Sequence, residues 1–287
     1  MIYQGIAVTG ADTGAGKTAV ACGLALLFRR AGIRVGVLKP VETGWAEGGR
    51  GSDALRLAAA AGLKIRDSHL FSGGSLEGFY EKIGDCPELN DVAPWRFAAP
   101  LAPEEAARLE GVEIGVDRIY QAMDRWTEWA DIVVVETAGG LMTPLNPRFT
   151  FADLLQGLEL PALVAAANRL GVINHVLLTL EALRRRDVTP IAVVLNDLND
   201  PLDPSADANA ALIERHGRVP VLRVPYAKSA TAANDGAEIG DCPELTEFAA
   251  RALAPRLPAL LEAMRSDWTR VALRYLGKRT RSSSDPN

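Results

Sequence analysis

One short segment limits what this chain can fold into more than any other. The sequence GADTGAGKT occupies residues 10–18, directly after an apolar run at 5–9 and before a second one at 19–27. It fits the pattern G-x-x-x-x-G-K-[ST], in which a loop between a strand and a helix directs backbone N–H groups at phosphate oxygens. In this pattern Lys17 lies on the β- and γ-phosphates and the Thr18 hydroxyl on Mg²⁺. A glycine-rich turn that happens to precede a lysine would also fit, but the flanking strand and helix favour a nucleoside triphosphate site.

Strand-like and helix-like segments alternate along most of the chain. After the first strand, further buried strands are expected at residues 35–38, 132–136, 162–166, 191–195 and 219–224. Helices are expected between them at residues 17–31, 53–62, 103–109, 117–129 and 172–186. This alternation predicts a doubly wound α/β domain with a mostly parallel sheet and flanking helices.

Two regions depart from the alternation. Between about residues 71 and 95 the periodicity breaks down, which predicts a surface insertion or lid within a phosphate-loop domain spanning 1–245. Residues 246–287 are expected to form a C-terminal helical extension with a disordered polar tail. The heptapeptide IGDCPEL occurs at 83–89 and again at 239–245. The two copies could pair Cys86 with Cys242, dock on one partner, or be a local duplication without function.

The composition narrows the class of partner. The 287 residues are 48% hydrophobic and carry a formal net charge of -5, which disfavours non-specific DNA or anionic membrane binding as the main task. Small molecules or other proteins are the expected partners. The three cysteines lack zinc-ligand spacing and fit a reduced compartment. There is no signal-peptide pattern and no run of about 18 apolar residues, so we expect a soluble, cytoplasmic protein.

Polar residues stand at the expected strand ends. Lys39 and Thr43 follow the second strand, and the carboxyl ends of parallel strands form one crevice, so both should face the phosphate loop. Asp53 follows a predicted N-cap and could serve the helix dipole alone. Glu136 ends a buried run, where it is either the first exposed residue or a second carboxylate near Mg²⁺. The amide of Asn196 is suited to reading an adenine edge.

Seven motifs together resemble one family. GADTGAGKT, KPVETG, GSDA, VETAGGLMTPL, FTFADLL, NRLGVINHVLLTLEAL and VVLND stand in one order between Ile6 and Tyr226, and together they resemble dethiobiotin synthetase. The resemblance implies a homodimeric ligase that uses ATP and Mg²⁺ to carboxylate the diamine 7,8-diaminononanoate with CO₂. It also implies that a carbamate forms, that ATP phosphorylates it, and that the second amine closes the ring.

The resemblance assigns roles to individual residues. Catalysis is implied for Thr13, Lys17 and Lys39, and metal binding for Thr18, Asp53 and Glu136. Substrate contacts are implied at Thr13, Lys39 and Thr43, with Gly171 and Asn174 serving the tail of the substrate bound by the other subunit. Nucleotide contacts are implied at Gly14, Ala15, Gly16, Lys17, Thr18, Ala19, Asp53, Glu136, Thr137, Ala138, Gly139, Asn196, Asp197, Pro225, Tyr226 and Ala227. We expect Lys39 to be exposed in the crevice, so that its replacement would affect folding only modestly.

Two substitutions and two alternatives qualify the resemblance. Gly14 stands where the family often has Glu, and Thr137 where it usually has Gly, which adds a side chain where the backbone should approach the nucleotide.

A nucleotide switch of the partition-ATPase type shares the phosphate-loop fold, but such proteins usually have an additional lysine where this chain has residues 11–13. A ligase that acts on a different substrate is the second alternative, because only the shape of the pocket separates the two.

Overall fold

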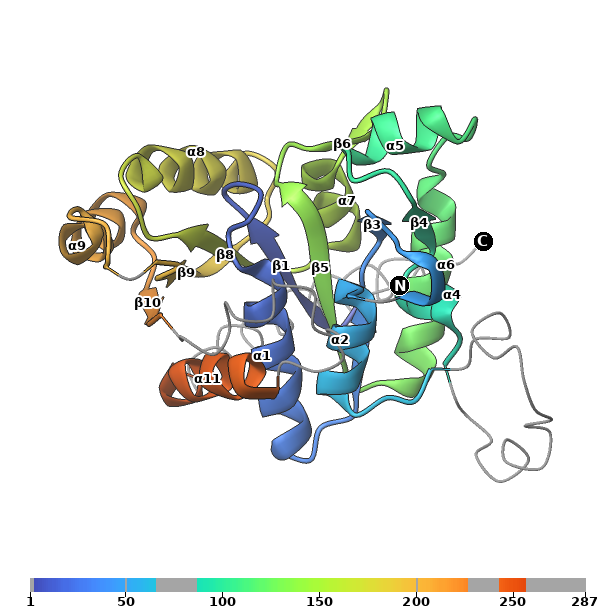
Figure 1. Ribbon diagram of the computed structural model, residues 1–287, viewed down its shortest axis with the longest axis horizontal. Coiled ribbons are helices and arrows are strands. Elements are labelled where there is room, and N and C mark those ends of the chain that lie inside the picture. The colour runs from blue at the N-terminus through green and yellow to red at the C-terminus, as the bar shows by residue number, and fades with distance from the viewer. Residues whose placement is uncertain (1–2, 50, 66–86, 200, 227–242, 257–287) are drawn as a thin grey trace, which may run out of the picture.

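The computed structural model describes residues 3–49, 51–65, 87–199, 201–226 and 243–256. At its centre lies a six-stranded sheet with the order β10-β9-β8-β1-β5-β2, in which all neighbouring strands are parallel (Figure 1). Its strands are β1 (Gly5–Gly10), β2 (Val35–Leu38), β5 (Ile132–Gly140), β8 (Ala162–Ala167), β9 (Pro190–Asn196) and β10 (Val221–Val224). The predicted parallel α/β fold is therefore confirmed, although β5 continues four residues beyond its expected end at Glu136.

Helices cover both faces of the sheet, as right-handed crossovers between parallel strands require. On one face, in front of the sheet in Figure 1, α1 (Lys17–Arg30) packs against α2 (Asp53–Ala61) and α11 (Pro243–Leu253). The opposite face carries α6 (Val116–Trp129), α7 (Phe151–Leu158), α8 (Val172–Arg184) and α9 (Ala206–Gly217). Because both faces are covered, β1 is buried along its whole length, which explains why Thr9 is its only polar side chain.

Smaller elements lie beside the carboxyl edge of the sheet. β3 (Val41–Thr43) pairs in parallel with β4 (Trp95–Phe97), and β6 (Pro144–Asn146) pairs antiparallel with β7 (Phe149–Thr150). The short helices are α4 (Leu89–Val92) and α5 (Pro103–Leu109), with 3₁₀ turns at Glu47–Gly49 and Ala254–Arg256. The sequence pattern predicted neither strand pair, nor the helices α4, α7 and α9.

The end of the segment expected as an insertion packs into the core. Val92 and Ala93 are fully buried, and the Val92 carbonyl accepts a hydrogen bond of 2.7 Å from the Lys39 backbone N–H. The expectation of a surface insertion is therefore wrong for residues 89–95, and residues 71–86 lie outside the described part of the chain. Cys86, Cys242, Ala227 and the apolar stripe and tail predicted after residue 256 lie outside the described residues, and the predictions about them stay predictions.

In the part of the chain that the structure describes, no helix is both long and apolar enough to cross a membrane.

Candidate nucleotide and substrate site

The phosphate loop joins β1 to α1 at the carboxyl edge of the sheet. Gly14 and Gly16 adopt left-handed backbone angles, with φ of 70° and 79°, which let the loop turn back over the start of α1. Lys17 opens the helix, and only 8% of its surface is exposed. Its ammonium donates a hydrogen bond of 3.2 Å to the Asp12 carbonyl oxygen. Burial, and next the Lys39 ammonium, lower the pKa of Lys17. The residues 14–19 assigned to the nucleotide thus form one loop and helix start, as predicted.

Asn196 supports this loop from the end of β9. Its Nδ2 donates to the Ala15 carbonyl oxygen at 2.6 Å, and its side chain is buried. A Cβ at Gly16 would come within 2.7 Å of the same Nδ2, so this loop position has no room for a side chain. The structure therefore shows Asn196 bracing the phosphate loop, and its role in reading adenine stays a prediction.

Four predicted site residues converge on one point below the loop. The Lys39 Nζ lies 2.5 Å from Glu136 Oε1 and 3.3 Å from Asp53 Oδ2. The Thr18 hydroxyl donates to the same Glu136 oxygen at 2.7 Å. The structure thus brings together Lys39 and all three residues that the resemblance assigns to the metal.

The expected exposure of Lys39 is wrong. Its residue is only 3% exposed, because α4 covers the end of β2 and two carboxylates enclose the ammonium. Glu136 is also fully buried, since β5 does not end there and the residue lies in register with Val8 of β1. Lys39 and Glu136 therefore form a buried ion pair, and the predicted modest effect of removing Lys39 has to be revised.

The pKa values in this cluster are set by burial and by mutual attraction. Burial lowers the pKa of Lys39, but the Glu136 and Asp53 carboxylates more than offset it, so this pKa is raised above its usual value. Burial raises the pKa of Glu136, and the Lys39 ammonium opposes this only in part. The pKa of Asp53 is lowered, because the attraction of Lys39 outweighs the effect of burial.

The oxygen atoms of this cluster fit a divalent cation. Glu136 Oε2 is buried and has no hydrogen-bond partner. Carboxylate and hydroxyl oxygens are the ligands that Mg²⁺ prefers, usually together with phosphate oxygens of the substrate. Within the described ranges, no three acidic, histidine or cysteine side chains could hold a metal by themselves. Thr18, Asp53 and Glu136 would therefore hold Mg²⁺ only together with the nucleotide phosphates.

Sequence reasoning overlooked Glu42. Ser52 caps α2 as predicted, since its hydroxyl accepts from Leu55 N at 3.2 Å. Glu42 lies against the same helix start, where its carboxylate accepts from the Asp53 backbone N–H at 2.7 Å and from Ala54 N at 3.1 Å. The signal available was an acidic residue three positions after Lys39 in the motif KPVETG, but the sequence alone does not show which groups it meets.

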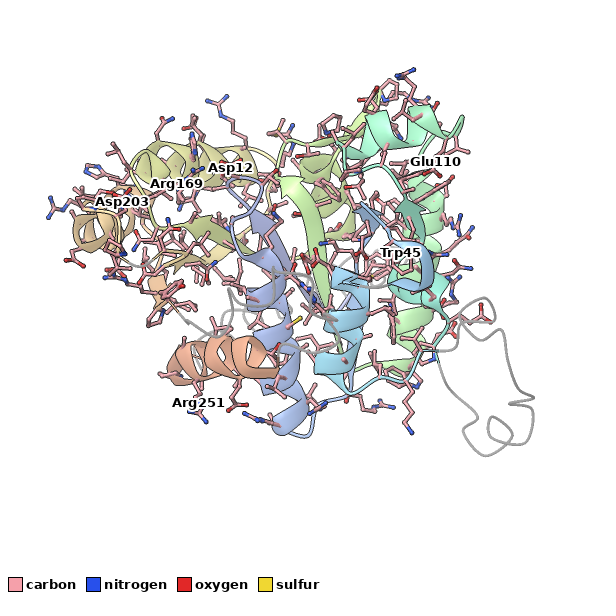
Figure 2. All side chains as sticks on the ribbon, viewed as in Figure 1. Asp12, Trp45, Glu110, Arg169, Asp203 and Arg251 are labelled. Carbon is pink, nitrogen blue, oxygen red and sulfur yellow. The ribbon has the colours of Figure 1, made fainter. Side chains whose placement is uncertain are left out.

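A cavity of about 490 Å³ opens beside the phosphate loop. Its lining is contributed by the loop, by the end of β5 and by α8: Ala11, Asp12, Thr13, Gly140, Leu141, Met142, Thr143, His175, Leu178, Thr179 and Ala182. Arg169 and Asp12 lie side by side at this edge, joined by an ion pair of 2.9 Å (Figure 2). Thr13 thus lines a cavity next to the loop, whereas Thr43 lies apart from its lining, in β3.

The residues assigned to the substrate tail lie outside this cavity. Gly171 caps the start of α8, and Asn174 is exposed in the first turn of the same helix. Both are at the surface, as a site shared with a second subunit would require. Large apolar side chains are exposed nearby: Met142 and Leu178, which line the cavity, and Leu170, which precedes α8 and is 80% exposed.

The remaining nucleotide residues differ in what they can contact. Thr137 is fully buried, and its hydroxyl donates to the hydroxyl of Thr9. The sequence had suggested that this side chain would stand between the backbone and the nucleotide, but it points away from the crevice into the sheet. Both carboxylate oxygens of Asp197 are engaged, one by Asn168 Nδ2 and the other by Arg223 Nε, each at 2.7 Å. These bonds tie β9 to its neighbours, and a nucleotide contact of Asp197 stays a prediction.

The other assigned positions follow strand ends. Ala138 and Gly139 continue β5 at the carboxyl edge, where Gly139 has a φ of 68°. Pro225 and Tyr226 directly follow β10. The sheet topology therefore brings these residues to the same edge as the phosphate loop, as predicted for parallel strands.

Comparison with known proteins gives consistent matches. A family model described as an AAA domain matches residues 4–72 and 78–234. The ATP-dependent dethiobiotin synthetase BioD of Anaeromyxobacter dehalogenans is 41% identical over 224 residues, which cover 78% of this chain and 90% of that protein. The protein of the same name from Bacillus licheniformis is 33% identical, with 77% and 85% covered. The one from Methanococcus vannielii is also 33% identical, with 76% and 92% covered.

Proposed function

This chain belongs to the ATP-dependent dethiobiotin synthetase family, and from that membership we propose that it closes the cyclic urea of dethiobiotin from 7,8-diaminononanoate, CO₂ and ATP. It is accordingly a ligase of biotin biosynthesis. The finer assignments that follow, to metal, substrate and subunit contacts, are parts of the same proposal.

The reaction proceeds in three steps. One amine of the diamine attacks CO₂ and loses a proton, which forms a carbamate. A carbamate oxygen then attacks the γ-phosphorus of ATP, so that a new P–O bond forms and ADP leaves. The second amine attacks the carbamate carbon and loses a proton, the second C–N bond forms, the bond from that carbon to the phosphorylated oxygen breaks, and inorganic phosphate leaves with the ring closed.

The residues below the phosphate loop have parts in the second step. Phosphoryl transfer depends on positioning and on cations around the oxygens of the transferring group. Lys17 at the helix start holds the β- and γ-phosphates, and Lys39 lies deeper, where its ammonium meets the carbamate and the γ-phosphate. Thr18, Asp53 and Glu136 would hold Mg²⁺, which would supply charge neutralisation at the phosphate oxygens.

One observation carries the proposal: Lys39, Asp53, Glu136 and Thr18, which come from four different segments, meet within hydrogen-bond distance beside the phosphate loop. A loop that only retains a nucleotide does not need a second, buried lysine next to its metal residues. A ligase that transfers the γ-phosphate to an anionic carbamate does, because negative charge accumulates on both reactants.

The substrate is best accommodated by the cavity beside the loop. Thr13 lies where the loop and the cavity meet, which suits the carbamate end. The apolar side chains of Leu141, Met142 and Leu178 suit a hydrocarbon chain. We assign the carboxylate tail to Gly171 and Asn174 of a second copy in a homodimer, a contact that would also cover the exposed Leu170 and Leu178.

Substrate-dependent ADP release tests this proposal. Purified protein with ATP and Mg²⁺ is offered 7,8-diaminononanoate, diamines of other lengths and amino acids of similar length, and ADP is measured with and without bicarbonate. We expect release only with 7,8-diaminononanoate and bicarbonate together. Release with a different diamine would redirect the proposal to another ligase, and release independent of any substrate would contradict it.

A further inference from the structure

The start of α2 is held by a buried carboxylate that the proposed reaction does not use. Glu42 is 6% exposed, and its Oε1 accepts from Asp53 N at 2.7 Å. Its Oε2 accepts from Ala54 N at 3.1 Å and from the Ser52 hydroxyl at 3.0 Å. Each oxygen of Glu42 therefore accepts at least one hydrogen bond from the start of α2.

Ser52 and Glu42 share the capping of α2, since Glu42 accepts from the first two N–H groups of the helix. The Ser52 hydroxyl already fills the N-cap position by accepting from Leu55 N. Burial, with the nearby Asp53 carboxylate, raises the pKa of Glu42, so a second acid here costs stability unless cations offset it. The two oxygens of Glu42 accept from the two backbone N–H groups separately, which a neutral amide with a single acceptor oxygen cannot do.

The charges around Lys39 suggest what the additional acid does. Glu136, Asp53 and Glu42 all act on the Lys39 ammonium. Lys17 acts on Glu136 and Asp53 as well, and Arg56 reaches Asp53 from the partly exposed rim at 3.5 Å. These three cations offset the three carboxylates one for one, so without Glu42 the cluster would carry a net positive charge. A net positive cluster would repel a divalent cation, and Glu42 therefore favours cation binding.

The same contacts fix the geometry of the cluster. Asp53 is the first residue of α2, and its side chain is 35% exposed, so packing alone does not hold it in place. The bond from its backbone N–H to buried Glu42 ties the Asp53 backbone to β3, which contains Glu42. Residues behind the direct ligands of a metal commonly orient them in this way.

We propose that Glu42 is a positioning residue of the cation site, which fixes the backbone of Asp53 and supplies negative charge without touching the cation or the nucleotide. This inference rests on the proposed function, because Asp53 is a metal ligand only within it.

The test measures Mn²⁺ binding by electron paramagnetic resonance on the full chain with a non-hydrolysable ATP analogue. Glu42→Gln keeps the shape of the side chain, removes its charge and replaces one of its two acceptor oxygens by an NH₂ group. We expect it to lower the Mn²⁺ affinity about tenfold or more, while the affinity for the analogue without metal stays within about twofold. Ser52→Ala is the matched control: it removes the cap of the same helix and one of the three donors to Glu42, and leaves the charge of Glu42 and its bond from Asp53 N. It should lower the midpoint of thermal unfolding without changing the Mn²⁺ affinity.

A double variant shows whether Glu42 acts through Asp53. If it does, Glu42→Gln added to Asp53→Asn lowers the Mn²⁺ affinity little further, and fully additive losses would overturn the inference. Glu42→Asp keeps the charge with a shorter reach, and serves as the test variant if Glu42→Gln does not fold; it should bind Mn²⁺ several-fold less tightly than wild type. Affinity equal to wild type in the Glu42 variants overturns the inference alone. Absence of Mn²⁺ uptake by the wild-type chain refutes the metal part of the proposed function, and the inference with it.

Discussion

Replacing Lys39 by alanine should destabilise the protein strongly, as well as stop turnover. The Lys39 ammonium is enclosed by Glu136 and Asp53, at 2.5 and 3.3 Å, and the Glu136 side chain is fully buried. Removing one member of a buried ion pair leaves the other charge without compensation, which costs about 3–5 kcal/mol in the free energy of unfolding. We expect a loss in this range near pH 8.

The loss should depend on pH in a definite direction. The pKa of Glu136 is already raised in the folded protein, and it rises further when Lys39 is absent. A carboxyl group with a raised folded pKa favours folding at low pH, and this contribution is lost as pH rises through the folded pKa. Asp53 owes its lowered pKa to Lys39, so its contribution to stability above its ordinary pKa also disappears in the variant. The difference between variant and wild type should therefore be smallest near about pH 5 and grow toward about pH 8.

Urea unfolding at both pH values measures this difference. The matched control is the double variant Lys39→Ala/Glu136→Gln, which removes the uncompensated charge and should regain more than half of the lost stability near pH 8 while remaining inactive. Lys39→Ala with the stability of wild type at both pH values would refute the buried ion pair. A double variant no more stable than the single one would show that the loss comes from packing instead.

Three further variants probe other parts of the site. Asn196→Ala removes the hydrogen bond to the Ala15 carbonyl and should raise the KM for ATP about fivefold, the equivalent of about 1 kcal/mol. An unchanged KM would show that Asn196 does not support the phosphate loop. In Gly14→Ala the added Cβ meets no atom within 4 Å, but alanine must adopt a φ of 70°. Urea titrations should therefore show a free energy of unfolding about 1 kcal/mol lower, and a stabilised variant would contradict this loop geometry. Leu178→Asp places a charge on the face assigned to the second subunit and should shift the protein from dimer to monomer in sedimentation velocity, whereas an unaltered dimer would locate the interface elsewhere.

The fold was predictable because its signals are local. The glycine spacing of residues 10–18 specifies the loop, and the buried runs specify the strands, because a strand covered on both faces must be apolar throughout. The end of β5 was harder to predict, because Thr137 to Gly140 resemble a loop in composition while continuing the strand.

The site was predictable in its membership but not in its contacts. Parallel topology brings Lys39, which follows β2, and Glu136 of β5 to one edge, whereas Asp53 begins a helix and only the family resemblance assigned it to the site. The burial of Lys39 was not predictable, because it depends on α4, which returns from a distant part of the chain to cover the end of β2. The contact of Glu42 with α2 is likewise tertiary, and no spacing in the sequence encodes it.

Isotope incorporation tests the central claim most directly. Purified protein is incubated with ATP, Mg²⁺, labelled bicarbonate and 7,8-diaminononanoate, and acid-stable label is counted alongside ADP. We predict one acid-stable label in a product with the mass of dethiobiotin for each ADP released, and none when the diamine is omitted. ADP formed without acid-stable label, or no reaction at all, would contradict the assignment of this chain as a ring-closing ligase.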